Sequence, residues 1–468
     1  MLPMKFLPAL AIGCLIASSA SAVDRPNVML ILADDLGYGD IGVHGCTDIP
    51  TPNIDSLAAD GVRFTNGYSS HPFCSPMRAG LMACRYQHRF GYVTNVAFDP
   101  HNQQMGLPTS ETTIAKRLTS AGYRTGMVGK WHLGAHANFH PMKRGFEFFY
   151  GFLGGGHDYF RVDTTVALNE NYRAALDDNG KPTSFDGYLT DALTDKALEF
   201  LSQQTDGQPY FLYVAYNAPH GPLQAPKRKL DQFKSIPNNK RRTYAAMVSA
   251  MDDQIGRLLN EIDRRGERES TLVFFLSDNG GPEHANASDN GQLRGQKGDV
   301  WEGGIRVPFL MRMPGTIPAG AIYEKPVISL DVSRTALHVA GINVSPDDPV
   351  EGVNLIPHVN GAKTDAPHDA LFWRMQFDAQ WAVRSGSRKL VRRPEGLSLY
   401  DLNADVSESM DLARQQATTV SQLRTKFDGW TRTNQPARFP GYRDYHKTLK
   451  QIHRDIQTAA QNDDRSDR

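Results

Sequence analysis

The sequence predicts an α/β fold, with a large, mainly parallel sheet flanked by helices on both faces. Between Asn27 and about Val307, apolar strand-like runs alternate with helix-like segments, the pattern of a parallel sheet covered on both sides. After about Asp365 the pattern changes to short strand-like pieces separated by turns, which predicts a smaller C-terminal antiparallel sheet plus helix subdomain. The length of 468 residues suits one large domain and a smaller one, because a domain takes about 150 residues or somewhat more.

Each predicted element follows from a local pattern. Residues 28–32 form a continuous apolar run, as a strand buried on both faces requires. Strands of the large sheet are expected at residues 28–32, 125–128, 210–215 and 272–276. A helix is expected at 53–60, since Thr51 can cap it and Pro52 suits its first turn. Residues 244–262 place apolar side chains along one helical face. The small sheet is expected from four pieces, at residues 371–374, 381–384, 388–391 and 397–400.

The first 22 residues are typical of an export signal. A short positive segment ending at Lys5 precedes an apolar stretch, and Ala20-Ser-Ala22 supplies a cleavage pattern. The alternatives are a buried N-terminal helix and lipoprotein anchoring through Cys14. We expect an exported protein, periplasmic or secreted, without membrane attachment after cleavage. The expected organisation is a signal peptide at 1–22, a catalytic domain at 23–364, a C-terminal subdomain at 365–458 and a polar tail at 459–468.

Composition excludes several classes of protein. The chain has 51 basic and 51 acidic side chains and a pI near 7.3. It therefore lacks the excess positive charge expected of a protein that binds nucleic acid. Its 40% hydrophobic residues are enough to build a sizeable core, which excludes a disordered chain.

Reactive side chains gather directly after the predicted strands. In an open parallel sheet the carboxyl ends of the strands form the ligand crevice, so groups placed there should converge. The groups so placed are Asp34 and Asp35, Lys130 and His132, His220, and Asp278 and Asn279. The two acidic pairs offer only oxygen ligands, which suit Ca²⁺ or Mg²⁺ rather than zinc. The alternative is that they are ordinary turn residues that end strands.

Cys74 precedes a short helix-like segment in Cys74-Ser75-Pro76-Met77-Arg78. The first turn of a helix offers free N–H groups and a positive dipole, a favourable place for an anionic nucleophile. The alternative is a small buried hydrophobic side chain, which is the common role of a lone cysteine.

Together these motifs resemble the formylglycine-dependent sulfatases of the alkaline phosphatase superfamily. The resemblance covers nearly the whole chain after the signal, and the motifs occur in the family's order. They lie at residues 27–35, 74–78 (Cys-x-Pro-x-Arg), 129–134, 218–220, 277–280, 293–306 and 399–402.

The resemblance implies a role for each matching residue. Cys74 would be oxidised to formylglycine by a formylglycine-generating or equivalent maturation enzyme, and its hydrate would be the nucleophile. Arg78 would steady that hydrate, Lys130 and Lys297 would neutralise sulfate oxygens, His220 would protonate the leaving alcohol and His132 would take a proton from the second hydroxyl. One Ca²⁺, with Mg²⁺ as the second choice, would be held by Asp34, Asp35, Cys74, Asp278 and Asn279.

The chain also departs from the family pattern. Cys84 stands where the family has glycine, and Gly156 where many relatives place a sulfate-contacting serine. The second departure makes His157 a candidate substrate contact, and Arg294 is another. If Cys74 is consumed by oxidation, Cys46 and Cys84 remain as a pair in an exported protein, so they form a candidate disulfide beside the alternative of two separate thiols.

The resemblance implies a sulfuric ester hydrolase that acts on a sulfated carbohydrate. Lys130 and Lys297 with a single oxygen-ligated metal favour the singly charged sulfate ester. The alternatives are a phosphodiesterase or phosphonate monoester hydrolase that uses the same diol, and an inactive sulfated-glycan-binding protein with Cys74 unmodified.

Overall fold

The structure is a computed structural model that describes residues 25–161, 176–205, 207–375, 380–441 and scattered positions between 445 and 458. The predicted signal peptide and polar tail lie outside the described residues. Within them, no helix is long and apolar enough to cross a bilayer.

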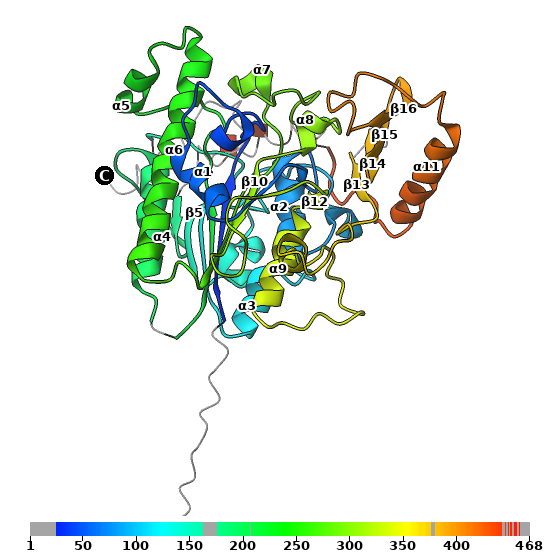
Figure 1. Cartoon of the computed structure of the whole chain (residues 1–468). Helices are drawn as coiled ribbons and strands as arrows, with labels where there is room; N and C mark the ends of the chain where they lie inside the picture. The colour runs from blue at the N-terminus through cyan, green and yellow to red at the C-terminus, as the bar shows by residue number, and fades with distance from the viewer. Residues whose placement is uncertain are drawn as a thin grey trace, which may run out of the picture.

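The core of the molecule is a ten-stranded sheet (Figure 1). Its five central strands run in parallel in the order β9-β1-β8-β4-β5. They are β1 (Asn27–Ala33), β4 (Arg124–Lys130), β5 (Phe148–Phe152), β8 (Tyr210–Ala215) and β9 (Thr271–Ser277). Four of these are the strands expected from the apolar runs. The predicted large sheet is confirmed, and the parallel pairing expected for most of it occupies its centre.

Antiparallel pairs occur toward both edges of the sheet, while the edge strand β11 pairs in parallel with β2. On one side β10 (Phe309–Arg312) runs against β9 and against β2 (Val62–Phe64), and β11 (Ala321–Tyr323) forms the edge. On the other side the hairpin of β6 (Leu176–Asp178) and β7 (Lys181–Thr183) pairs with β5. The sheet is therefore mixed as a whole and parallel where the candidate site lies.

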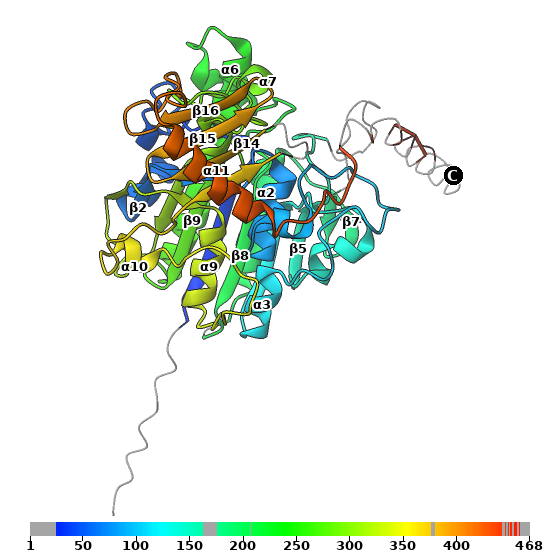
Figure 2. The same cartoon turned by 90° about the vertical axis from the view of Figure 1, so that its right-hand side faces the viewer.

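Helices cover both faces of this sheet (Figures 1 and 2). Alternate residues of β1 enter two different apolar clusters: Val28 and Leu30 join one, and Met29 and Ile31 join the other. The first cluster also contains α2 (Cys74–Ala83), α3 (Ile114–Ser120) and α9 (Leu330–Val339). The second contains α1 (Pro52–Ala59), α4 (Leu189–Ser202) and α6 (Asn239–Arg264). This alternation is what a strand with a two-residue period and two buried faces requires.

The small antiparallel sheet is also confirmed. Its strands are β13 (Leu371–Arg374), β14 (Trp381–Ser385), β15 (Arg388–Arg393) and β16 (Gly396–Asp401), in that order. Helix α11 (Ala417–Thr431) crosses its outer face (Figure 2). β3 (Gly67–Tyr68) and β12 (Val327–Ile328) form a separate two-stranded parallel sheet.

A buried ion network joins the small sheet to the large part of the chain. The Lys389 ammonium lies 2.8 Å from a Glu302 oxygen and 2.9 Å from a Glu408 oxygen, and all three side chains are fully buried. Glu302 opens the short helix α8 (Glu302–Ile305), and its backbone N–H donates to Glu408. Burial raises the pKa of Glu408 to about 7, although Lys389 opposes the shift. The network therefore depends on its single shared ammonium.

Replacing Lys389 with methionine should destabilise the protein strongly. The substitution keeps the approximate length of the side chain but leaves Glu408 buried without its cation and leaves Glu302 with the more distant Arg306, at 3.4 Å. Breaking a buried pair in this way costs about 3–5 kcal/mol. Denaturant unfolding measures this change in the free energy of unfolding. The matched control is Lys363→Met at an exposed lysine, and equal stability of the two variants would contradict the prediction.

Candidate active site

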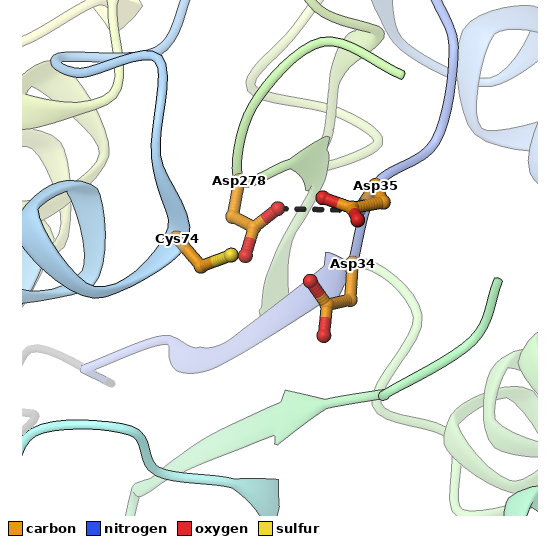
Figure 3. A group of neighbouring side chains, drawn as sticks. All are labelled: Asp34, Asp35, Cys74 and Asp278. Atoms are coloured by element: carbon orange, nitrogen blue, oxygen red, sulfur yellow. Dashed lines mark hydrogen bonds between the residues drawn. The ribbon is translucent and has the colours of Figure 1, made fainter. Parts of the chain in front are cut away.

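The side chains that follow the parallel strands converge on one buried cluster (Figure 3). Asp34 and Asp35 come directly after β1, and Asp278 comes directly after β9. Cys74 is the first residue of α2, and Phe73 is its N-cap. The ligand atoms of the three aspartates and Cys74 all lie within 4.8 Å of one another, and all four residues are buried. The carboxyl edge of the sheet thus holds a compact anionic centre.

Each carboxylate of this centre has its own cationic partner. The Lys130 ammonium lies 2.6 Å from Asp34 Oδ2, and the Lys297 ammonium lies 2.6 Å from Asp35 Oδ1. The Arg78 guanidinium donates from Nε and Nη2 to Asp278 Oδ2, at 3.1 and 2.8 Å. Lys130 ends β4, while Arg78 lies in the second turn of α2. Three cations from three segments therefore surround the thiol and the carboxylates.

The donor set fits a hard divalent cation. Asp34 Oδ1 and Asn279 Oδ1 are buried and have no hydrogen-bond partner among the described residues. The Asn279 amide is held in place by a hydrogen bond, which its Nδ2 donates to Asp35 Oδ1 at a distance of 2.7 Å. A buried acceptor without a partner is costly, and a cation among these oxygens would remove that cost. Oxygen donors of this kind suit Ca²⁺ or Mg²⁺.

The two adjacent aspartates have opposite pKa shifts. Burial raises the pKa of Asp34 to about 7, against the opposing charge of Lys130. Burial also acts on Asp35, but the charges of Lys297 and His220 outweigh it and lower the pKa of this group to about 2. A divalent cation would hold Asp34 ionised as well, so the centre is electrostatically suited to bind one.

His220 lies at the mouth of the cluster. It follows β8, and its Nε2 lies 3.6 Å from Asp35 Oδ2 while its Nδ1 lies 2.7 Å from the Gly221 carbonyl. Burial lowers the pKa of His220 to about 4, although Asp35 opposes the shift. The Tyr159 hydroxyl lies 2.6 Å from the Asn217 carbonyl and 2.8 Å from that of His220. Tyr159 therefore positions the loop that carries this histidine.

His132 is held in an unusual backbone conformation beside the nucleophile segment. Its φ is +57°, a left-handed conformation that few non-glycine residues adopt. The Ser75 hydroxyl donates 2.6 Å to the His132 carbonyl and lies 2.8 Å from the Tyr92 hydroxyl. On the ring side, a Cβ at Gly155 would come within 2.9 Å of the imidazole, so only glycine leaves room there. Burial, with Lys130 nearby, keeps the pKa of His132 well below its usual range.

Ser75, Tyr159 and Gly155 are residues that the sequence analysis missed. Ser75 lies inside the Cys-x-Pro-x-Arg motif, so its position was a signal. The partners of Ser75 and Tyr159 are backbone carbonyls of distant segments, and no pattern in the sequence reveals such a contact.

The two candidate substrate contacts lie outside the inner cluster. His157 is buried, with its Nδ1 2.7 Å from the Asp158 carbonyl and its ring near Phe152. Arg294 is exposed, and its guanidinium lies over Trp301 at 4.1 Å and donates to the Glu408 carbonyl. Their roles in binding substrate stay predictions.

The candidate Cys46–Cys84 disulfide is wrong in this structure, where both thiols are free. Cys84 belongs to the apolar cluster on one side of the sheet, and Cys46 packs against the cluster on the other side. Cys84 has a φ of +58° as the C-cap of α2, the conformation that favours glycine. The backbone therefore explains why the family has glycine there, and no bridge is needed.

Thiol titration should find both of these cysteines free. In the denatured, unreduced protein, Cys46 and Cys84 should each react with a thiol reagent, because neither has a sulfur partner. Loss of both reactive thiols, restored by reduction, would contradict the structure.

Two family models that match the chain, and two of its relatives, are named as sulfatases or sulphohydrolases. Residues 26–342 match the Sulfatase family model, and residues 296–432 match the model of the N-sulphoglucosamine sulphohydrolase C-terminal region. The chain is 31% identical over 482 residues to arylsulfatase J of Mus musculus, covering 90% of this chain and 78% of that protein. It is 35% identical over 368 residues to N-acetylgalactosamine-6-sulfatase of Homo sapiens, covering 75% and 69%.

The fold comparison agrees with the sequence comparison. The crystal structure of Ps i-CgsB in complex with k-i-k-neocarrahexaose superposes with a TM-score of 0.84 at 35% identity, covering 93% of this chain and 99% of that one. A sulfatase from Pseudoalteromonas sp., PsFucS1, superposes with a TM-score of 0.75 at 24% identity, covering 87% and 90%. The latter likeness concerns the fold alone.

Proposed function

The chain belongs to the sulfatase family and is a sulfuric ester hydrolase, and we propose that it removes sulfate from a sulfated poly- or oligosaccharide through a nucleophile formed from Cys74. The observation that carries this proposal is the Cys74 thiol on the first turn of α2, among three carboxylates and three cations. Relatives named for an amino-sugar sulfate, and a related structure in complex with a carrageenan oligosaccharide, support a carbohydrate substrate.

In the proposed reaction a maturation enzyme, using its own two-electron oxidant, first converts the Cys74 side chain to formylglycine, so that the C–S bond is replaced by C=O and the sulfur leaves as sulfide. The Cβ of Cys74 would become the aldehyde carbon, and the hydroxyl oxygens of the hydrate would replace the thiol sulfur at the centre of the cluster. Burial raises the pKa of the thiol to about 12, so an unmodified Cys74 is a poor thiolate nucleophile. Arg78 orients the metal-binding carboxylate of Asp278 and lies behind the nucleophile, where it steadies the hydrate.

The ammonium groups of Lys130 and Lys297 would bind the sulfate oxygens. Lys130 and Lys297 approach the centre from β4 and from the 294–301 loop, and in the proposed complex they neutralise charge on the transferring group. A divalent cation held by Asp34, Asp35, Asp278 and Asn279 would polarise the sulfate and the hydrate when bound. Ca²⁺ is our first choice and Mg²⁺ the second, because Ca²⁺ accepts irregular sets of oxygen ligands.

Proton transfer is assigned to the two histidines. One hydroxyl of the hydrate attacks sulfur and gives its proton to a neighbouring carboxylate of the centre, while the S–O bond to the sugar breaks and protonated His220 gives a proton to the leaving alcohol. Burial disfavours this protonated imidazole, whereas the negative charge of Asp35 favours it. His132 then takes a proton from the second hydroxyl, so that sulfate leaves and the aldehyde forms again. Water rehydrates the aldehyde. The low pKa of His132 keeps its imidazole neutral, the form that a base requires.

Replacing His220 with glutamine should affect poor leaving groups most. A sugar alcohol needs a proton as it leaves, so its sulfate ester should lose about 10²–10⁴-fold in kcat. An aryl sulfate such as 4-nitrophenyl sulfate, whose leaving group is a stabilised anion, should lose far less. Steady-state kinetics with both esters measures the ratio, and an equal loss for both would remove His220 from the acid role.

Substrate assays and mass analysis test the function as a whole. A panel of position-defined sulfated oligosaccharides should reveal at least one substrate by ion chromatography of released sulfate. The intact mass of the Cys74 peptide should show formylglycine in active material. Unmodified cysteine in a protein that still hydrolyses sulfate esters would refute the proposed nucleophile, and no release from any ester would refute the function.

We also propose that the protein is exported and that residues 1–22 are removed. The charged, apolar and small-residue segments of this stretch support the proposal. The N-terminal sequence of the mature protein tests it, with cleavage after Ala22 as the expected result.

A further inference from the structure

A cavity of about 420 Å³ lies between the small sheet and α11, outside the reaction centre. It is lined by Arg374, Trp381, Arg392, Arg424, Phe427 and Asp428. These residues come from β13, β14, β15 and α11. The described residues that line the cavity thus all belong to the C-terminal part of the chain, where α11 crosses the small sheet (Figure 2).

Strand register directs two of the arginines to the same face. Arg374 is the cross-strand partner of Trp381, and Trp381 is the partner of Arg392. Directly opposed residues of antiparallel strands project from the same side of the sheet. The Trp381 ring stacks on Phe427 of α11 at 4.0 Å, which identifies this side as the one that α11 covers. Arg374 and Arg392 therefore flank one buried aromatic ring.

Arg392 and Arg424 differ in how their charge is neutralised. Among the described residues that line the cavity Asp428 is the single carboxylate, and it accepts from Arg424 Nε at 2.9 Å. Arg392 has no ion pair among the described residues. The next residue, Arg393, points to the other face and is paired with Asp299 at 3.0 Å. On this strand the guanidinium of Arg393 is therefore neutralised by an ion pair, whereas that of its neighbour Arg392 has no such pair among the described residues.

The guanidinium groups of Arg392 and Arg424 lie near one described carboxylate, so a further anion between them would relieve their mutual repulsion. Guanidinium groups bind the oxygens of sulfate-like groups through paired N–H donors. The buried rings of Trp381 and Phe427 form an apolar floor, and exclusion of water from that side strengthens such contacts.

We propose that this cavity is a second anion site that binds a sulfate group of the polysaccharide away from the reaction centre. The inference rests on the proposed function, because a polymer with several sulfate groups can occupy both places at once. Lys389 and Arg393 face the opposite side of the small sheet, toward Glu302 and Asp299. The cavity is therefore separate from the Lys297 loop, and it contributes to binding of long chains without touching the reacting bond.

Binding to a sulfated polymer tests the site directly. The probe is dextran sulfate, with uncharged dextran as the blank, and the protein is the full chain carrying Cys74→Ala to prevent turnover. In affinity electrophoresis, Arg392→Gln with Arg424→Gln should raise the Kd for dextran sulfate about tenfold or more. The charge-matched control is Arg257→Gln with Arg264→Gln on the exposed face of α6, and it should change the Kd less than about twofold.

The outcomes separate this site from general charge effects. Equal loss of binding in the two double variants, or no loss in either, would overturn the proposal. Arg424 also contacts Asp428 and lies over Trp381, so thermal unfolding checks that the double variant folds. If that variant is unstable, the single Arg392→Gln variant decides, because it removes no ion pair among the described residues.

A small substrate distinguishes failure of this site from failure of the proposed function. With Cys74 intact, the Arg392 and Arg424 variants should hydrolyse 4-nitrophenyl sulfate like the parent protein, while KM rises for a sulfated polymer. A parent protein that hydrolyses no sulfate ester would refute the function but leave the dextran sulfate result standing. An unchanged Kd for dextran sulfate in the Arg392 and Arg424 variants would refute the second site alone. Free sulfate at the same ionic strength as a chloride control should compete weakly, and full competition would indicate a site for the free ion instead of the polymer.

Discussion

Replacing Cys74 with alanine is expected to reduce sulfate release to less than about a hundredth of the parent rate, because the loss of a covalent nucleophile costs orders of magnitude. The side chain is small and buried at the start of α2, and alanine fits the same space. Fold and substrate binding should therefore survive, which circular dichroism and calorimetry with a sulfated oligosaccharide can measure.

The matched control for this variant is Cys46→Ala. Cys46 is a second cysteine of the described chain, and its thiol donates to Asp48 at 3.3 Å, away from the centre. Its loss should leave kcat unchanged. Retention of more than about a hundredth of the activity by the Cys74 variant would remove Cys74 from the reaction.

Removal of the divalent cation is expected to abolish activity and to lower the thermal stability. The centre then retains two buried oxygen acceptors without partners and an Asp34 carboxyl whose pKa is raised to about 7. Added Ca²⁺ should restore activity better than Zn²⁺, since the aspartate and asparagine donors are oxygen atoms. A cation at about 100 times its Kd adds about 2.7 kcal/mol to the free energy of unfolding.

Replacing one metal-binding residue tests whether the effect of Ca²⁺ on thermal stability comes from this site. Asn279→Ala removes an oxygen that has no other partner, so the Ca²⁺-dependent rise in Tm should shrink. Asn360→Ala, at an exposed asparagine, should leave that rise unchanged. Full activity in a preparation that contains no metal by elemental analysis would refute the metal site.

The sequence predicted the central strands well for a simple physical reason. β1 and β8 are buried along their whole length, so their apolar runs are uninterrupted and their ends are marked by polar residues. The antiparallel edges were less apparent. β6 and β7 are short and half exposed, and nothing in such segments specifies the direction of pairing.

Side chains of the site were predictable where topology decides their place. Asp34 and Asp278 end neighbouring parallel strands, so their convergence follows from the order of strands. The position of Cys84 misled the analysis, because a pattern of residues does not reveal a positive φ. The contact of Ser75 with the His132 carbonyl depends on the path of two separate loops, which local patterns leave undetermined.

If Cys74 is oxidised as proposed, its burial limits when that reaction can take place. The thiol is only 2% exposed and every residue of α2 is buried, so a maturation enzyme has no access to it in the folded protein. β1 needs β9 as its neighbour, and that strand lies about 200 residues further along the chain than Cys74. At roughly 5–20 residues per second, synthesis of that stretch takes roughly 10–40 s. The long-range pairing of the sheet thus opens a time window in which the nascent chain still presents the cysteine, and the window closes when the sheet does.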